Sequence, residues 1–292
     1  RVVSINELWD IDMRLYSHVT VKTGATLTVT CKLLMPLEGV IKVERGAKLI
    51  VDGGTIMRGN TCSPSQYWRA ISVSGNSTKI QPVPTLALAA NDAGVVILKN
   101  QGVLEGAIVG VTTERIVKIY EPEFWGGVVD VNDFTFKDCL TGVGFMKYDW
   151  PNISKFNKAS FIRTSTGSPQ KGVNIWDTDG ILFEECTFTN MAQNGIRALD
   201  AVFNVKQKNK FSGSAIAILA GASAPLSGQI QVGVIGLTGT DRNKFENNVV
   251  GIRATANSNV EIFSNDFENS NFDIAINGTT KSAITDNIFK GS

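Results

Sequence analysis

A nine-residue pattern occurs twice near the start of the chain. Residues 21–29 read VKTGATLTV and residues 43–51 read VERGAKLIV, with valine, glycine, alanine, leucine and valine in the same order. The interval of about 22 residues is typical of leucine-rich repeats and of the coils of a β-helix. The same interval leads from Val51 to Val73 and Val95, and we expect these three valines to be equivalent in successive repeats.

The C-terminal half repeats a different pattern at the same interval. Phe245, Phe267 and Phe289 are evenly spaced by it, and looser copies surround four earlier phenylalanines, namely Phe136, Phe161, Phe188 and Phe211. Equivalent side chains in stacked coils lie above one another, so we expect a continuous ladder of phenylalanines inside the protein. Asparagines near these phenylalanines, namely Asn190, Asn247 and Asn269, are expected at bends.

The residue types favour a β-helix over a leucine-rich repeat. Valine, isoleucine, phenylalanine and threonine dominate short alternating runs, as in strands, and the 28 glycines suit tight bends. We predict an all-β fold, a single-stranded right-handed parallel β-helix with coils of about 22 residues. One domain should cover residues 1–292, with loop excursions near residues 74–92, 112–127 and 221–243 where the repeat fails.

Composition excludes several functions. The 28 basic and 27 acidic residues give a net charge of +1, so no overall field attracts nucleic acid. No apolar run is long enough to span a membrane. His18 is the single histidine and lies far along the chain from any carboxylate cluster, and no zinc or calcium motif is present. We therefore predict no cofactor, no metal, no nucleic-acid partner and no membrane span.

Residues 174–181, NIWDTDGI, contain the strongest catalytic candidates. Asp177 and Asp179 alternate, so on a strand both would project from one face, and glycosidases use paired carboxylates. The stretch resembles the NTDG segment of polygalacturonases, which are also β-helices, but the other motifs of that family are missing. The alternative is that both aspartates form a bend between strands.

Three tryptophans are candidates for contact with a glycan: Trp125, Trp150 and Trp176. They stand at or near the edges of coils, close to carboxylates, where an exposed ring could stack on a sugar. The alternative is that tryptophans cover the ends of the core beneath loops. Trp68 and Trp125 favour this alternative because each shortly precedes an apolar strand.

The four cysteines fall into two groups. Cys31 and Cys62 are about one coil apart and either form a disulfide in an oxidising compartment or remain thiols. Cys139 and Cys186 should be two coils apart, about 9.6 Å, which is too far for a disulfide. We expect these two to be buried thiols.

The N-terminal motifs GATLTV and GAKLIVDGGTI, followed by YWRAISVSGNS and VVILKNQGVLEGAIVGV, resemble secreted β-helix proteins of Bacteroidota. The resemblance covers residues 19–111, with Ala70 in place of a usual glycine and an additional Gln101. It implies export by the type IX route and residence outside the cell or at its surface. The family's C-terminal sorting domain is missing from the sequence, which implies a processed or partial product.

Together these features favour a non-catalytic extracellular scaffold, an adhesin-like or structural module of a larger surface or secreted protein. The expected partners are flanking domains, other surface proteins or a polysaccharide. The alternatives are a carbohydrate-active enzyme, either a polysaccharide lyase or a glycoside hydrolase, and a glycan-binding module without catalysis.

Overall fold

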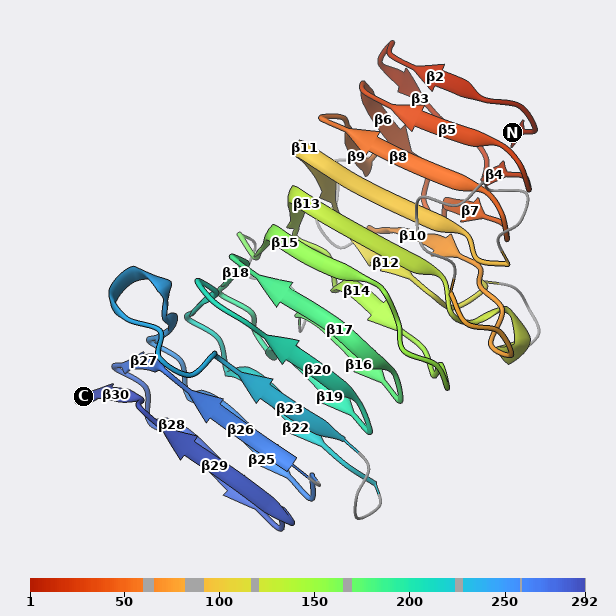
Figure 1. Cartoon of the computed structure of the whole chain (residues 1–292). Helices are drawn as coiled ribbons and strands as arrows, with labels where there is room; N and C mark the ends of the chain where they lie inside the picture. The colour runs from red at the N-terminus through yellow and green to blue at the C-terminus, as the bar shows by residue number, and fades with distance from the viewer. Residues whose placement is uncertain are drawn as a thin grey trace.

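In the computed structural model, the chain winds into a stack of coils, each contributing one strand to each of three faces (Figure 1). The structure describes residues 1–59, 66–81, 92–116, 121–164, 170–223, 228–257 and 259–291. Every pairing between these strands is parallel, and the two termini lie at opposite ends of the stack. Within this part of the chain the only helical segments are two short 3-10 turns, η2 (Pro122–Phe124) and η3 (Gly239–Asp241).

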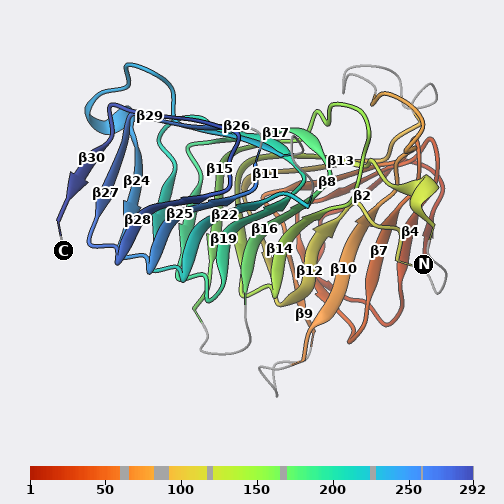
Figure 2. The same cartoon turned by 90° about the horizontal axis from the view of Figure 1, so that it is seen from below.

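Face 1 is an eleven-stranded parallel sheet, whose strands follow one another across Figure 2. Its strands, in order along the stack, are β1 (Val2–Val3), β4 (Val19–Val21), β7 (Val40–Val43), β10 (Trp68–Val73), β12 (Ala107–Thr112), β14 (Thr141–Phe145), β16 (Lys171–Trp176), β19 (Asn194–Leu199), β22 (Ile216–Gly221), β25 (Val250–Thr255) and β28 (Phe272–Asn277).

Face 2 follows face 1 in each coil, and face 3 completes the coil. Face 2 contains β2 (Glu7–Trp9), β5 (Thr26–Val29), β8 (Lys48–Asp52), β11 (Val95–Glu105), β13 (Val128–Lys137), β15 (Lys155–Ile162), β17 (Asp179–Glu184), β20 (Val202–Val205), β23 (Gln229–Val232), β26 (Asn259–Phe263) and β29 (Lys281–Thr285). Face 3 contains β3 (Met13–Arg14), β6 (Lys32–Met35), β9 (Thr55–Arg58), β18 (Thr187–Thr189), β21 (Lys210–Ser212), β24 (Asn243–Glu246), β27 (Asn265–Glu268) and β30 (Ile288–Lys290). The long strands β11, β13 and β15 bend through both faces.

The bends between faces use left-handed backbone. Gly24 and Gly46, equivalent in the first repeat, have φ values of 83° and 68°, and the Gly24 N–H donates to the Gly46 carbonyl. The predicted bend asparagines Asn190, Asn247 and Asn269 have φ values of 58°, 55° and 54°. Asparagine tolerates this conformation better than most residues, so the prediction that they lie at bends is confirmed.

The interior contains the predicted ladder of phenylalanines. Phe136, Phe161, Phe188, Phe211, Phe245, Phe267 and Phe289 stack in that order, with ring centroids 4.6 to 5.3 Å apart. This interval is close to the separation of neighbouring strands, about 4.8 Å, so the backbone pairing sets the ring stacking. Towards the N-terminus the core is aliphatic, with Leu27 aligned on Leu49 as predicted.

The phenylalanine ladder packs against small residues on face 1. A Cβ atom on Gly172 would lie 2.6 Å from the Phe188 ring and 2.5 Å from the Gly195 carbonyl oxygen, too close for any side chain. The same contact recurs for Gly110 with Phe136, Gly142 with Phe161, Gly195 with Phe211 and Gly251 with Phe267. The Gly-Val and Gly-Ile pairs of the C-terminal repeats therefore make room for the aromatic rings.

The expected equivalence of Val51, Val73 and Val95 is wrong. Val73 aligns with Val43 on face 1, whereas Val51 lies on face 2 and aligns with Leu98. The chain between β9 and β10 lengthens this coil, so the constant interval no longer leads to the equivalent position. Coil length, rather than the repeat itself, causes the error.

Most of the described residues of the three excursions lie between a strand of face 1 and the following strand of face 2. The described parts of the first two pack on each other: the Gly75 N–H donates to the Phe124 carbonyl, and the buried Gln81 amide donates to the carbonyls of Gly126 and Gly127. The third predicted excursion contains regular structure, because residues 229–232 form strand β23 on face 2. The alternating pattern QIQV predicts a strand only weakly, because it is short and glycines flank it on both sides.

Candidate functional site

Asp177 and Asp179 lie at a corner of the helix, where β16 ends and β17 begins. Asp177 has left-handed backbone with φ 46° and is not part of a strand, so the prediction that both aspartates project from one strand face is wrong. Its carboxylate pairs with Lys147 Nζ at 2.8 Å, and Asp179 Oδ1 accepts the Val202 N–H at 3.1 Å. Both residues therefore contribute to the bend, the alternative that the sequence left open.

The electrostatics of this corner follow from its contacts. Hydrogen bonds from Lys147 to Asp177 and Asp149 raise the pKa of the Lys147 ammonium. Partial desolvation raises the pKa of Asp179, the Val202 N–H opposes this, and the charge of Asp177 raises it further. Two neighbouring carboxylates are thus held by a lysine and a backbone N–H. A catalytic role for them stays a prediction.

The candidate tryptophans differ in accessibility. Trp125 is 3% exposed and packs edge-to-face on Trp176, with ring centroids 5.6 Å apart. A sugar cannot stack on a buried ring, so the prediction that Trp125 contacts a glycan is wrong. Trp125 instead covers the core beneath a loop, which is the alternative given above. Trp176 is half-buried, and Trp150 is 39% exposed. Among the three, Trp150 is the ring most open to a ligand.

The cysteine predictions have different outcomes. Cys139 and Cys186 are buried thiols, as predicted, and burial raises the pKa of each to about 12. Cys31 has no disulfide partner among the described residues, and Cys62 lies outside them. The disulfide between Cys31 and Cys62 therefore stays a prediction.

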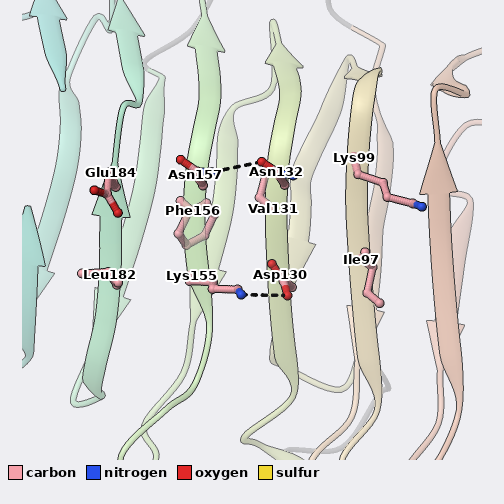
Figure 3. A pocket seen from close by; sticks show the side chains of 10 residues that line it. All are labelled: Ile97, Lys99, Asp130, Val131, Asn132, Lys155, Phe156, Asn157, Leu182 and Glu184. Carbon is pink, nitrogen blue, oxygen red and sulfur yellow. Dashed lines mark hydrogen bonds and ion pairs between the residues drawn. The ribbon is translucent and has the colours of Figure 1, made fainter. Parts of the chain in front are cut away.

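A groove on the outer side of face 2 gathers polar side chains from four successive coils (Figure 3). Its volume is about 410 Å³. Strands β11, β13, β15 and β17 supply its outward side chains in two rows, the first formed by Ile97, Asp130, Lys155 and Leu182 and the second by Lys99, Asn132, Asn157 and Glu184. We call this surface the face 2 groove.

The polar groups of the face 2 groove pair along the axis of the stack. Lys155 Nζ lies 3.6 Å from Asp130 Oδ2, and Asn157 Nδ2 donates to Asn132 Oδ1 at 3.1 Å (Figure 3). Glu184 accepts a hydrogen bond from Gln207 at 2.8 Å in the next coil.

At the N-terminal end of the groove, a charged side chain also pairs with the preceding coil. Lys99 pairs with Asp52 at 2.9 Å. The pKa of Asp52 is lowered by its hydrogen bonds to Lys99 and Asn100. Each charged group lining the groove therefore has a partner one coil away.

The repeat pattern of the sequence does not predict this groove. Its rows join residues at unequal sequence separations, because these coils differ in length, so a constant interval does not align them. A local signal was present: Asp130-Val131-Asn132 and Lys155-Phe156-Asn157 share the order charged, apolar, asparagine. In a strand this order places the two polar side chains outward on either side of a buried residue.

The described residues form neither a cluster suited to a metal ion nor a helix suited to span a membrane. No three His, Cys, Asp or Glu side chains in these ranges lie together in a group that could hold a metal ion. In the same part of the chain, no helix combines the length and apolar character needed to cross a membrane.

Comparison with known proteins agrees with the observed coils. The family model described as "Right handed beta helix region" matches residues 168–292. The chain is a right-handed parallel β-helix. No curated protein matches it. A crystal structure of a double mutant of the periplasmic alginate epimerase AlgG is similar at 11% identity, covering 94% of this chain and 73% of that chain with a TM-score of 0.19. A likeness this low carries no argument about the function of this β-helix.

Proposed function

We propose that this β-helix is a non-catalytic extracellular scaffold, an adhesin-like structural module of a larger surface or secreted protein. The proposal rests on one observation: charged side chains on the surface form ion pairs between neighbouring coils. Among the described residues, ion pairs with nitrogen–oxygen distances of 2.7 to 3.9 Å join one coil to the next, for example Lys22–Glu44, Asp52–Lys99, Glu105–Lys137, Asp130–Lys155, Lys158–Glu185 and Lys210–Glu246.

Such pairs suit a structural role better than a catalytic one. An exposed pair contributes only about 0.2–1 kcal/mol, but pairs repeated along a solenoid add to each interface between neighbouring coils. A catalytic acid or base instead has to be available to a substrate proton. In the face 2 groove the carboxylates of Asp130 and Glu184 are both engaged by a neighbouring coil.

The placement outside the cell is supported by the N-terminal motifs. Residues 19–111 resemble secreted β-helix proteins of Bacteroidota, in which export follows the type IX route. A stack of parallel strands leaves few backbone groups unpaired along its faces, which suits a protein exposed to proteases. Flanking domains of a longer chain or other surface proteins are the partners that this proposal implies.

The test is a search for cleavage. The chain is incubated with neutral and acidic polysaccharides, and both new reducing ends and the ultraviolet absorbance of unsaturated products are followed. We expect no product above that of a heat-unfolded sample. Product formation that is lost in Asp130→Asn or Asp179→Asn, while the β-sheet circular dichroism is unchanged, would contradict a non-catalytic scaffold.

A carbohydrate-active enzyme is the second candidate, and one observation favours it. Asp130 and Lys155 bring an acid and a base together in a groove on one β-face, which a lyase or hydrolase requires. The two acids of the groove are less suited to hydrolysis, because strand geometry places Asp130 and Glu184 about 12 Å apart, beyond the usual separation of paired catalytic carboxylates. The cleavage assay with Lys155→Gln separates this candidate from the scaffold.

A further inference from the structure

We propose that the face 2 groove binds a linear, uncharged polysaccharide that lies along the axis of the β-helix. The inference rests on the proposed non-catalytic function and names the ligand class of this surface. It concerns binding through the groove and does not involve the tryptophans at the corner.

The groove has the shape for an extended chain. It runs across four strands, and three strand separations of about 4.8 Å give a length of about 14 Å along the axis. The volume of about 410 Å³ lies within the range of small-ligand sites. Asn132 and Lys155 of the groove are exposed to solvent, so a polymer can reach the groove from its outer side.

The middle of the groove offers hydrogen-bonding groups of both kinds. The Asn157 amino group donates a hydrogen bond to the Asn132 carbonyl oxygen at 3.1 Å. The Asn132 amino group and the Asn157 carbonyl have no protein partner among the described residues. A sugar hydroxyl both donates and accepts, so two adjacent hydroxyls can satisfy both groups.

The ends of the first row are apolar. Ile97 and Leu182 are half-buried and stand on either side of the pair formed by Asp130 and Lys155. The C–H faces of sugar rings can pack on such side chains, while hydroxyl groups reach the polar centre. The arrangement of apolar ends and a polar middle suits a glycan better than a wholly apolar or wholly charged ligand.

The charged side chains of the face 2 groove do not favour an acidic polymer. Two lysines and two carboxylates line the groove, and both lysines are already paired, Lys99 with Asp52 and Lys155 with Asp130. The groove therefore has no surplus positive charge with which to attract a uronate or sulfated chain. The balanced charge of the groove therefore favours an uncharged polysaccharide.

The test measures binding to a panel of soluble polysaccharides by affinity gel electrophoresis and calorimetry. The panel contains neutral β-glucan, xylan and mannan together with acidic alginate and polygalacturonate. The variant Asn132→Ala/Asn157→Ala removes the open amide groups. Asn174→Ala is the matched control, because its half-buried amide on face 1 likewise bonds a neighbouring coil, accepting from Arg197 at 3.3 Å.

We expect at least one neutral polysaccharide to bind and the double variant to weaken it about tenfold or more, since each lost hydrogen bond costs about three- to tenfold. Asn174→Ala should bind like the parent, and all three proteins should have the same circular dichroism. The inference is overturned if no neutral polymer binds, if only acidic polymers bind, or if Asn174→Ala weakens binding as much as the double variant. These outcomes leave the non-catalytic proposal standing, since that proposal fails only on cleavage.

Discussion

The phenylalanine ladder predicts a large difference between two chemically identical substitutions, Phe211→Ala and Phe289→Ala. Phe211 is fully buried and stacks on Phe188 at 4.6 Å and on Phe245 at 4.9 Å. Phe289, at the end of the same ladder, is 53% exposed and contacts one ring of the ladder, Phe267, at 5.3 Å. Removing a ring from the interior therefore loses two stacking partners, whereas removing the terminal ring loses one.

The magnitudes follow from burial. Phe211→Ala removes buried area and leaves a cavity between two rigid coils, which costs about 3–5 kcal/mol. Phe289→Ala leaves no enclosed cavity, and about half of the usual 1.5–3 kcal/mol for burying the ring is lost, so the cost is about 1 kcal/mol. The free energy of unfolding should differ by about 3 kcal/mol between the two variants.

The assay is urea unfolding followed by circular dichroism, with the m value checked for each variant. Hydrogen exchange of β18, β21 and β24 adds local information, because a solenoid can open coil by coil. Phe211→Leu serves as a control that retains an apolar side chain and should fall between Phe211→Ala and the parent. Equal losses of stability for Phe211→Ala and Phe289→Ala would refute the claim that the ladder forms a continuous core.

Three further substitutions test separate contacts. Gly172→Ala should cost about 1–3 kcal/mol in urea unfolding, because its Cβ would meet the Phe188 ring at 2.6 Å, and no measurable loss would argue against this packing. The hydrogen bonds that Asp286 accepts from Ser264 and Arg242 lower its pKa. These bonds should stabilise the last coil above about pH 4, and the stabilisation should be lost as the pH falls through the lowered pKa. Hydrogen exchange of β30 measures this effect, and a pH dependence that is unchanged in Asp286→Asn would contradict it. Trp125→Ala should cost about 3–5 kcal/mol, whereas Trp150→Ala at a partly exposed ring should cost about 1–2 kcal/mol. A glycan array on the folded variants shows whether Trp150 contributes to binding.

The sequence predicts the fold well wherever coil length is constant. The even spacing of Phe245, Phe267 and Phe289 matches stacked positions on face 3, and the repeat of residues 21–29 matches residues 43–51 one coil later. Constant spacing works there because both strand pairing and side-chain stacking repeat with every coil. Where the chain adds residues at a corner, the same interval crosses from one face to another, as it does between Val51 and Val73.

The candidate site could be predicted only in part for the same reason. Asp177 and Asp179 are close in sequence, so the sequence predicts that they lie near each other. It does not predict the left-handed backbone of Asp177, which determines where the carboxylates point. The face 2 groove joins Asp130, Lys155 and Leu182 from coils of different lengths. A linear pattern carries no information on which of these residues will become neighbours until the length of every coil is known.

We propose that this β-helix binds a glycan on face 2 without cleaving it. The most direct measurement is the molar mass of a neutral polysaccharide during prolonged incubation with a stoichiometric amount of the folded chain, followed by light scattering after size separation. We expect a complex that Asn132→Ala/Asn157→Ala weakens and a polymer whose molar mass stays constant. A molar mass that falls with the parent chain but not with Asp130→Asn would contradict it.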